Sequence, residues 1–161
     1  MGAAASKPLR ILYIVTSLAE YNSGSRATQK GSDRLQETLI PILTEGVESM
    51  LSFGYHVDVH LVCHWTMLPN RLELIRQKLP PLVGLDVWDD ASPLGYSVVT
   101  KNNHIEYLTV HLARQHRFVI KDKFADYDFF VAFEDDMLIK GDHGKSSMRQ
   151  LFLVVSLLIC S

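Results

Sequence analysis

Four short segments have the residue pattern of β-strands. Residues 9–16 and 129–133 are apolar runs rich in β-branched or aromatic residues, which is typical of strands buried on both faces. Residues 83–87 predict a third, brief strand. Residues 55–63 alternate polar with apolar positions, so they predict a strand with one polar face.

Helical periodicity follows the first of these strands. Apolar residues recur at helical spacing after Asp33, which we expect to cap the helix in a capping box with Gln36. Pro41 should kink this helix or split it in two, because proline lacks the N–H that an unbroken helix needs. Gly54 is expected to end it.

Two further helices are predicted, over residues 70–79 and over 104–116, the second capped by Asn102 or Asn103. Phe118 to Ile120 form only a short apolar piece before the last strand. Strands and helices therefore alternate along the chain. This order predicts an α/β fold with a largely parallel, Rossmann-like sheet flanked by helices.

Length and composition favour one domain. The chain has 161 residues, of which 47% are hydrophobic, so it can bury a core of its own. We expect a flexible N-terminus over 1–8, an α/β domain over 9–140 and an atypical apolar tail over 141–161. The net charge of −2 makes nucleic acid an unlikely partner. Cys63 and Cys160 give no disulfide framework or zinc site, and Cys63 is expected in a core strand.

The two ends bear on membrane attachment. Gly2 lies in an N-myristoylation pattern, although one acyl chain gives only weak membrane binding. A secretory signal is the alternative, with Ile11 to Val15 as its apolar core, but that run suits a first strand better. Residues 151–160 are almost wholly apolar, yet about ten residues cannot span a bilayer as a helix, which needs roughly 20.

Two acidic groups follow predicted strands. Glu134, Asp135 and Asp136 come directly after the aromatic strand, where clustered carboxylates would repel one another unless a divalent cation offset their charge. A solvated acidic turn is the alternative, but the apolar residues from Met137 to Ile139 are expected to return to the core. The pair Asp89 and Asp90 follows the third strand and would lie at the same edge of a parallel sheet, although a simple Asp-rich turn also explains it.

The run from Asp126 to Met137, Asp-Tyr-Asp-Phe-Phe-Val-Ala-Phe-Glu-Asp-Asp-Met, resembles the metal-binding strand of GT-A type glycosyltransferases. The resemblance covers roughly residues 9 to 140. It implies that the chain binds a nucleotide-diphosphate sugar, transferred to an unknown acceptor, through Mn²⁺ or Mg²⁺. Asp136 would then be the direct metal ligand. Glu134 and Asp135 would hold ribose or sugar hydroxyls, or bind the metal through water.

Other residues have candidate roles at the same site. Asp89 and Asp90 would contact the ribose or base of the donor. Arg26 and Lys30, in the long polar loop after the first strand, are candidates for the diphosphate, with mobile surface cations as the alternative. A eukaryotic enzyme of this type would lie in the Golgi or endoplasmic reticulum. Myristoylation of Gly2 would instead place the chain in the cytoplasm or at a membrane.

The chain departs from the GT-A pattern after Asp136, because the region that normally carries the acceptor site and the catalytic base has no counterpart. An incomplete, donor-binding GT-A-like domain is therefore expected, with the catalytic group unknown. The opening of the chain also resembles GT-B glycosyltransferases. A P-loop at Gly144-Lys-Ser fails because Ile139 occupies the position of its first glycine. A non-catalytic acylated adaptor remains a further alternative.

The polar face of the second strand carries His56, Asp58 and His60, a spacing that places all three side chains on one side. Such a triplet can hold a metal. We favour the simpler interpretation of a polar strand face, because imidazoles are tolerated half-buried.

Overall fold

The fold was analysed in a computed structural model. The structure describes residues 7–19, 33–64, 66–91, 98–101, 104–107, 112, 114–135 and 137. Of residues 98–101 and 104–107 it describes the backbone alone. Gly2, Arg26, Lys30 and Asp136 lie outside the described residues, as do residues 1–6 of the N-terminus predicted to be flexible over 1–8, and the tail over 141–161.

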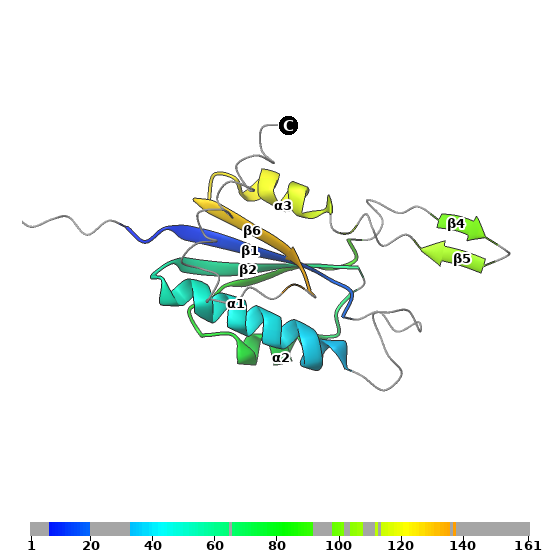
Figure 1. Ribbon diagram of the computed structural model, residues 1–161, viewed down its shortest axis with the longest axis horizontal. Coiled ribbons are helices and arrows are strands. Elements are labelled where there is room, and N and C mark those ends of the chain that lie inside the picture. The colour runs from blue at the N-terminus through cyan, green and yellow to red at the C-terminus, as the bar shows by residue number, and fades with distance from the viewer. Residues whose placement is uncertain are drawn as a thin grey trace, which may run out of the picture.

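Four parallel strands form the central sheet (Figure 1). They are β1 (Arg10–Ser17), β2 (His56–Cys63), β3 (Leu85–Trp88) and β6 (Phe129–Glu134). Their order across the sheet is β3-β2-β1-β6, so β1 and β2 lie in the middle. The predicted α/β fold with a parallel, Rossmann-like sheet is thereby confirmed.

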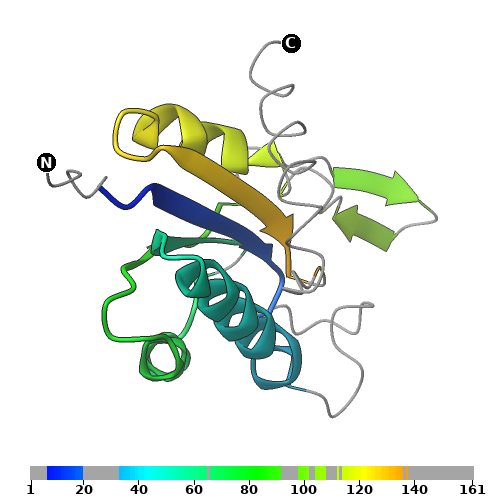
Figure 2. The same cartoon turned by 60° about the vertical axis from the view of Figure 1, so that its left-hand side comes forward.

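Helices cover both faces of this sheet (Figures 1 and 2). On one face lie α1 (Ile40–Ser52) and α2 (Pro69–Lys78), and on the other lies α3 (His116–Lys123). Alternate residues of β1 therefore enter two separate cores. Tyr13 packs with the residues of α1, whereas Leu12 packs with Val119 of α3.

Asp33 caps the first helical segment, as predicted, but with a different set of bonds. Its carboxylate accepts a hydrogen bond from the N–H of Leu35 at 3.1 Å and one from the side-chain amide of Gln36 at 2.8 Å. In a capping box the third residue would instead reach back to the backbone N–H of Asp33. Here Glu37 accepts that N–H, at 3.3 Å.

The helix is split ahead of Pro41, as predicted. Residues Leu35–Leu39 form a short π-helix, η1, in which the N–H of Ile40 bonds to the carbonyl of Leu35. Pro41 is the second residue of α1 and has no N–H to donate, so regular α-helical bonding cannot run unbroken through this point. Gly54 follows the end of α1 with a φ of 82°, which a glycine adopts without strain.

The prediction of a helix over residues 104–116 is wrong. Val98–Lys101 and His104–Tyr107 are instead the antiparallel strands β4 and β5, paired from Lys101 with His104. Asn102 and Asn103, interpreted as a helix cap, lie between these strands, and asparagine is as common in tight hairpin turns as at helix starts. The crossover helix α3 begins at His116 and includes the apolar piece at 118–120.

The return to the core predicted after the acidic run does not begin at Met137, which is 49% exposed. Residues 138 and 139 lie outside the described part of the chain. Cys63, by contrast, is buried in β2, as predicted.

Candidate functional site at the carboxyl ends of the strands

The order in which the chain adds strands to the sheet reverses at β1. From β1 the chain proceeds through α1 to β2 and β3 on one side, while β6 pairs with the opposite side of β1. The connections on the two sides cover opposite faces of the sheet (Figure 2). In open α/β sheets, ligands bind outside the carboxyl ends of the strands at such a switch point. Here those ends are Ser17 of β1 and Glu134 of β6.

Asp135 is buried at this switch point, with 4% of its surface exposed. Its backbone N–H bonds to the carbonyl of Thr16 at 3.0 Å, which continues the pairing of β6 with β1. One carboxylate oxygen, Oδ2, accepts the hydroxyl of Ser17 at 2.6 Å, the N–H of Leu18 at 3.1 Å and Nε of Arg34 at 3.3 Å. The other, Oδ1, accepts Nη2 of Arg34.

Asp135 therefore forms a bidentate ion pair with Arg34, and its charge is offset by the protein itself. No pattern in the sequence points to this partner, because Arg34 precedes Asp135 by 101 residues. Neither Arg34 nor Ser17 was among the residues that we expected at the site.

Glu134 differs from its neighbour although it is adjacent in sequence. Side chains alternate along a strand, so Glu134 lies on the α3 side of the sheet with Phe130 and Ala132. It is exposed, and it pairs in register with Thr16 of β1. Its carboxylate is thus accessible at the switch point, whereas that of Asp135 is enclosed.

Asp89 and Asp90 lie at the same edge of the sheet as Glu134, because β3 and β6 run parallel. They are at its opposite side, however, since β3 and β6 are the outer strands of the four. Three strand spacings separate them, which is roughly 14 Å. Both residues are exposed, and Asp90 has a φ of 51°. A left-handed backbone outside glycine is uncommon, although aspartate tolerates it better than most residues.

Backbone hydrogen bonds join the strand ends between these two acidic positions. The N–H of His64 donates to the carbonyl of Ser17 at 3.3 Å, and the N–H of Ala91 donates to the carbonyl of Cys63 at 3.0 Å. The ends of β1, β2 and β3 are therefore held in one row. We call the row of carboxyl ends of β3, β2, β1 and β6, from Asp89 after β3 across the sheet to Glu134 of β6, the carboxyl rim.

Among the residues that the structure describes, no three His, Cys, Asp or Glu side chains are grouped closely enough to hold a metal ion. Glu134 and Asp135 offer the hard oxygen atoms that Mg²⁺ and Mn²⁺ prefer. The third carboxylate of the predicted site, Asp136, is not among the residues searched.

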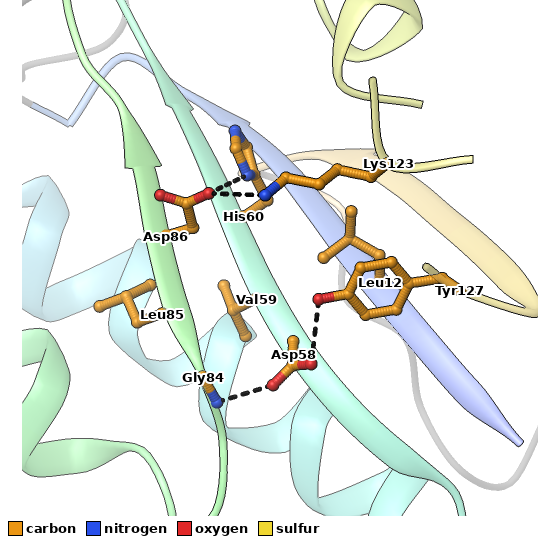
Figure 3. Close-up of a pocket in the computed structure, with 9 residues that line it drawn as sticks. All are labelled: Leu12, Asp58, Val59, His60, Gly84, Leu85, Asp86, Lys123 and Tyr127. Atoms are coloured by element: carbon orange, nitrogen blue, oxygen red, sulfur yellow. Dashed lines mark hydrogen bonds and ion pairs between the residues drawn. The ribbon is translucent and has the colours of Figure 1, made fainter. Parts of the chain in front are cut away.

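A second polar cluster lies on the α3 side of β2 and β3 (Figure 3). His56, Asp58 and His60 share this face, as the sequence predicted, and a cleft of about 330 Å³ opens beside the last two. Lys123 of α3 and Tyr127 form its other wall. The cleft lies on the face of the sheet that α3 covers, away from the carboxyl rim.

Asp58 connects the amino ends of the strands. Its carboxylate accepts the hydroxyl of Tyr127 at 3.0 Å and the N–H of Gly84 at 2.9 Å. The guanidinium of Arg10 lies 3.7 Å from the same carboxylate and 4.7 Å from the centre of the Tyr127 ring. Burial, together with the bond to Asp58, raises the pKa of Tyr127 to about 12. These contacts are structural and leave little of Asp58 for a ligand.

His60 lies on the floor of the cleft, with Nδ1 at 3.3 Å from Oδ2 of Asp86. Lys123 reaches the same oxygen at 3.5 Å. Burial lowers the pKa of His60, and the charge of Asp86 opposes this only in part. The sequence did not reveal Asp86, Lys123 or Tyr127. Its only signal was a polar face on a parallel strand, where both faces are usually apolar.

No family model matches this sequence, and searches of curated proteins and of solved structures also give no match. Within the described part of the chain, no helix has the length and apolar character needed to cross a membrane. Function is therefore inferred from the fold and from the chemistry of the carboxyl rim.

Proposed function

We propose that the carboxyl rim binds a nucleotide-diphosphate sugar through a divalent metal, Mn²⁺ or Mg²⁺, held in the acidic run at Glu134 and Asp136. The observation that carries this proposal is the position of the acidic run. Glu134 ends β6 directly at the switch point of a parallel sheet, where α/β proteins of this kind bind their ligands.

The acidic run suits a phosphorylated ligand only together with a cation, because carboxylates repel phosphates. A bound divalent cation would bridge the two and stabilise the charge that develops on a departing diphosphate. Asp136 would be its direct ligand, and the exposed carboxylate of Glu134 would contact the metal through water or hold a hydroxyl of the donor. The resemblance of residues 126–137 to GT-A glycosyltransferases supports the same assignment.

The remaining candidates would complete the donor site. Asp89 and Asp90, roughly 14 Å from Glu134 across the sheet, would contact the ribose or base of the nucleotide. Arg26 and Lys30 belong to the connection that leaves β1 at the switch point, and they would contact the diphosphate. The chain would thus form the donor-binding part of a glycosyltransferase-like protein.

Isothermal titration with UDP-sugars and GDP-sugars, with and without Mn²⁺, tests this proposal. We expect binding that requires Mn²⁺ and disappears in Asp136→Ala. Asp126→Ala is the matched control, because this exposed aspartate precedes the amino end of the same strand and should leave binding unchanged. If the folded wild-type chain binds none of these nucleotide sugars, the proposed function is wrong.

A further inference from the structure

The connection between β1 and the first helical segment starts and ends at a single side chain. Ser17 and Leu18, at its start, both donate hydrogen bonds to Oδ2 of Asp135. Arg34, at its end, donates to both oxygens of the same carboxylate. We infer that Asp135 is a positioning residue of the carboxyl rim, which holds both ends of this connection and does not bind the ligand itself.

The start of the connection is fixed by a short chain of bonds. The hydroxyl of Ser17 donates to Asp135 at 2.6 Å and accepts the N–H of Ala19 at 3.0 Å. With Leu18 also donating to Asp135, three successive residues from the last one of β1 onward are bonded directly or indirectly to one carboxylate. Removing that carboxylate would leave the hydroxyl of Ser17 and the N–H of Leu18 without their acceptor.

The end of the connection is fixed by two consecutive ion pairs. Arg34 pairs with Asp135, and the residue before it, Asp33, forms a bidentate pair with Arg71 of α2 at 2.9 and 3.2 Å. The two residues just before η1 are therefore bonded to the residue after β6 and to α2. Bidentate pairs of this kind fix orientation as well as distance.

Burial and saturation argue against direct ligand binding by Asp135. Its side chain is 5% exposed and accepts four hydrogen bonds from the protein, whereas the neighbouring Glu134 is open to solvent. On the proposed function, on which this division of roles rests, Glu134 and Asp136 would face the donor and its metal. Asp135 would act through Arg34 and Ser17 on the connection that carries Arg26 and Lys30.

Limited digestion with trypsin tests the positioning role without any ligand, because Arg26 and Lys30 are trypsin sites within the connection. Removing a charge-assisted hydrogen bond should raise local opening and speed cleavage after these residues by about tenfold in Asp135→Asn and in Arg34→Gln. The double variant should be no faster than the faster single variant, because both remove the same interaction.

Two further variants keep this test decisive. Ser17→Ala removes only the hydroxyl at the start of the connection, with its bonds to Asp135 and Ala19, so it should speed the same cleavages even if the charge variants fold poorly. Tyr127→Phe removes a bond to Asp58 at the opposite end of the sheet and should match the wild type. Cleavage after Lys123 in α3 reports global unfolding. Rates that rise equally at Lys123 and Arg26, or do not rise at all, would overturn the inference.

Titration with nucleotide sugars and Mn²⁺ then tests the ligand side. Loss of an outer partner of a metal site typically weakens binding by about 10–100-fold, and we expect this in both Arg34→Gln and Asp135→Asn, with Mn²⁺ still required. If Asp135 bound the metal directly, Asp135→Asn alone would abolish binding, as is expected of Asp136→Ala, and the positioning role would be wrong. A wild-type chain that binds no nucleotide sugar refutes the proposed function, while the trypsin result still decides the role of Asp135.

Discussion

Arg34 and Asp135, which are 101 residues apart in the chain, form a bidentate ion pair between the first helical turn and the end of β6. The arginine side chain is 18% exposed and the aspartate side chain 5%, so water screens the pair little. The pair lies at the switch point of the sheet, and it fixes the position of Arg34, at which the connection after β1 ends.

Breaking this pair from one side should strongly destabilise the fold. Arg34→Met leaves the buried carboxylate of Asp135 without its charge partner, which typically costs about 3–5 kcal/mol of unfolding free energy. Urea denaturation monitored by circular dichroism measures the loss. Adding Asp135→Asn should recover part of it, because no unpaired charge then remains. A double variant as unstable as Arg34→Met would contradict this account.

Stability should fall in mildly acidic solution because of His60. Burial lowers the pKa of its imidazole in the folded protein below the value of about 6.5 in the unfolded chain. The unfolded chain therefore binds a proton that the folded protein does not, and the free energy of unfolding falls as the pH drops below about 6.5. His64, also buried, has its pKa lowered in the same direction.

Urea denaturation at pH 7.5 and pH 5.5 measures this effect. Replacing the imidazole in His60→Gln should reduce the difference between the two pH values. His56→Gln, at an exposed position on the same strand face, is the matched control. An equal pH dependence in His60→Gln and the wild type would show that His60 is not responsible.

Gly84 is required beside Asp58. A Cβ added at Gly84 would lie 2.6 Å from Oδ1 of Asp58, closer than real Cβ atoms approach. The carboxylate cannot swing away without losing the N–H of Gly84 and the hydroxyl of Tyr127. Gly84→Ala should therefore cost about 1–3 kcal/mol in thermal or urea denaturation. In an Asp58→Ala background the same change should cost clearly less, and an undiminished cost would rule out this contact as the cause.

The ion pair between Asp33 and Arg71 should be visible in the titration of the aspartate. The guanidinium of Arg71 is the main cause that lowers the pKa of Asp33 to about 2. In Arg71→Gln we expect this pKa to rise towards 3.8, measured by NMR titration of the carboxyl carbon. Arg76→Gln, on the same helix, is the control. The stabilising effect of the pair is present above pH 4 and is lost as the pH falls towards about 2.

Much of the fold could be predicted from local sequence. The apolar run over 129–133 and the alternating run over 55–63 became β6 and β2, because burial on two faces or on one leaves a distinct residue pattern. Pro41 split its helix, because a missing N–H acts within one turn wherever the chain lies. The failure at 104–116 is equally local, since Asn102-Asn103 suits a hairpin turn as well as a helix cap.

For the candidate site, too, one part followed from local sequence and another only from the tertiary structure. By itself, the sequence determined that three carboxylates follow a strand and that strands and helices alternate, because these patterns are short in range. Only the tertiary structure decided that Glu134 is open while Asp135 is enclosed by Ser17 and Arg34. Parallel strands bring together chain segments about a hundred residues apart, and the partners of a buried charge leave no periodic trace in the sequence.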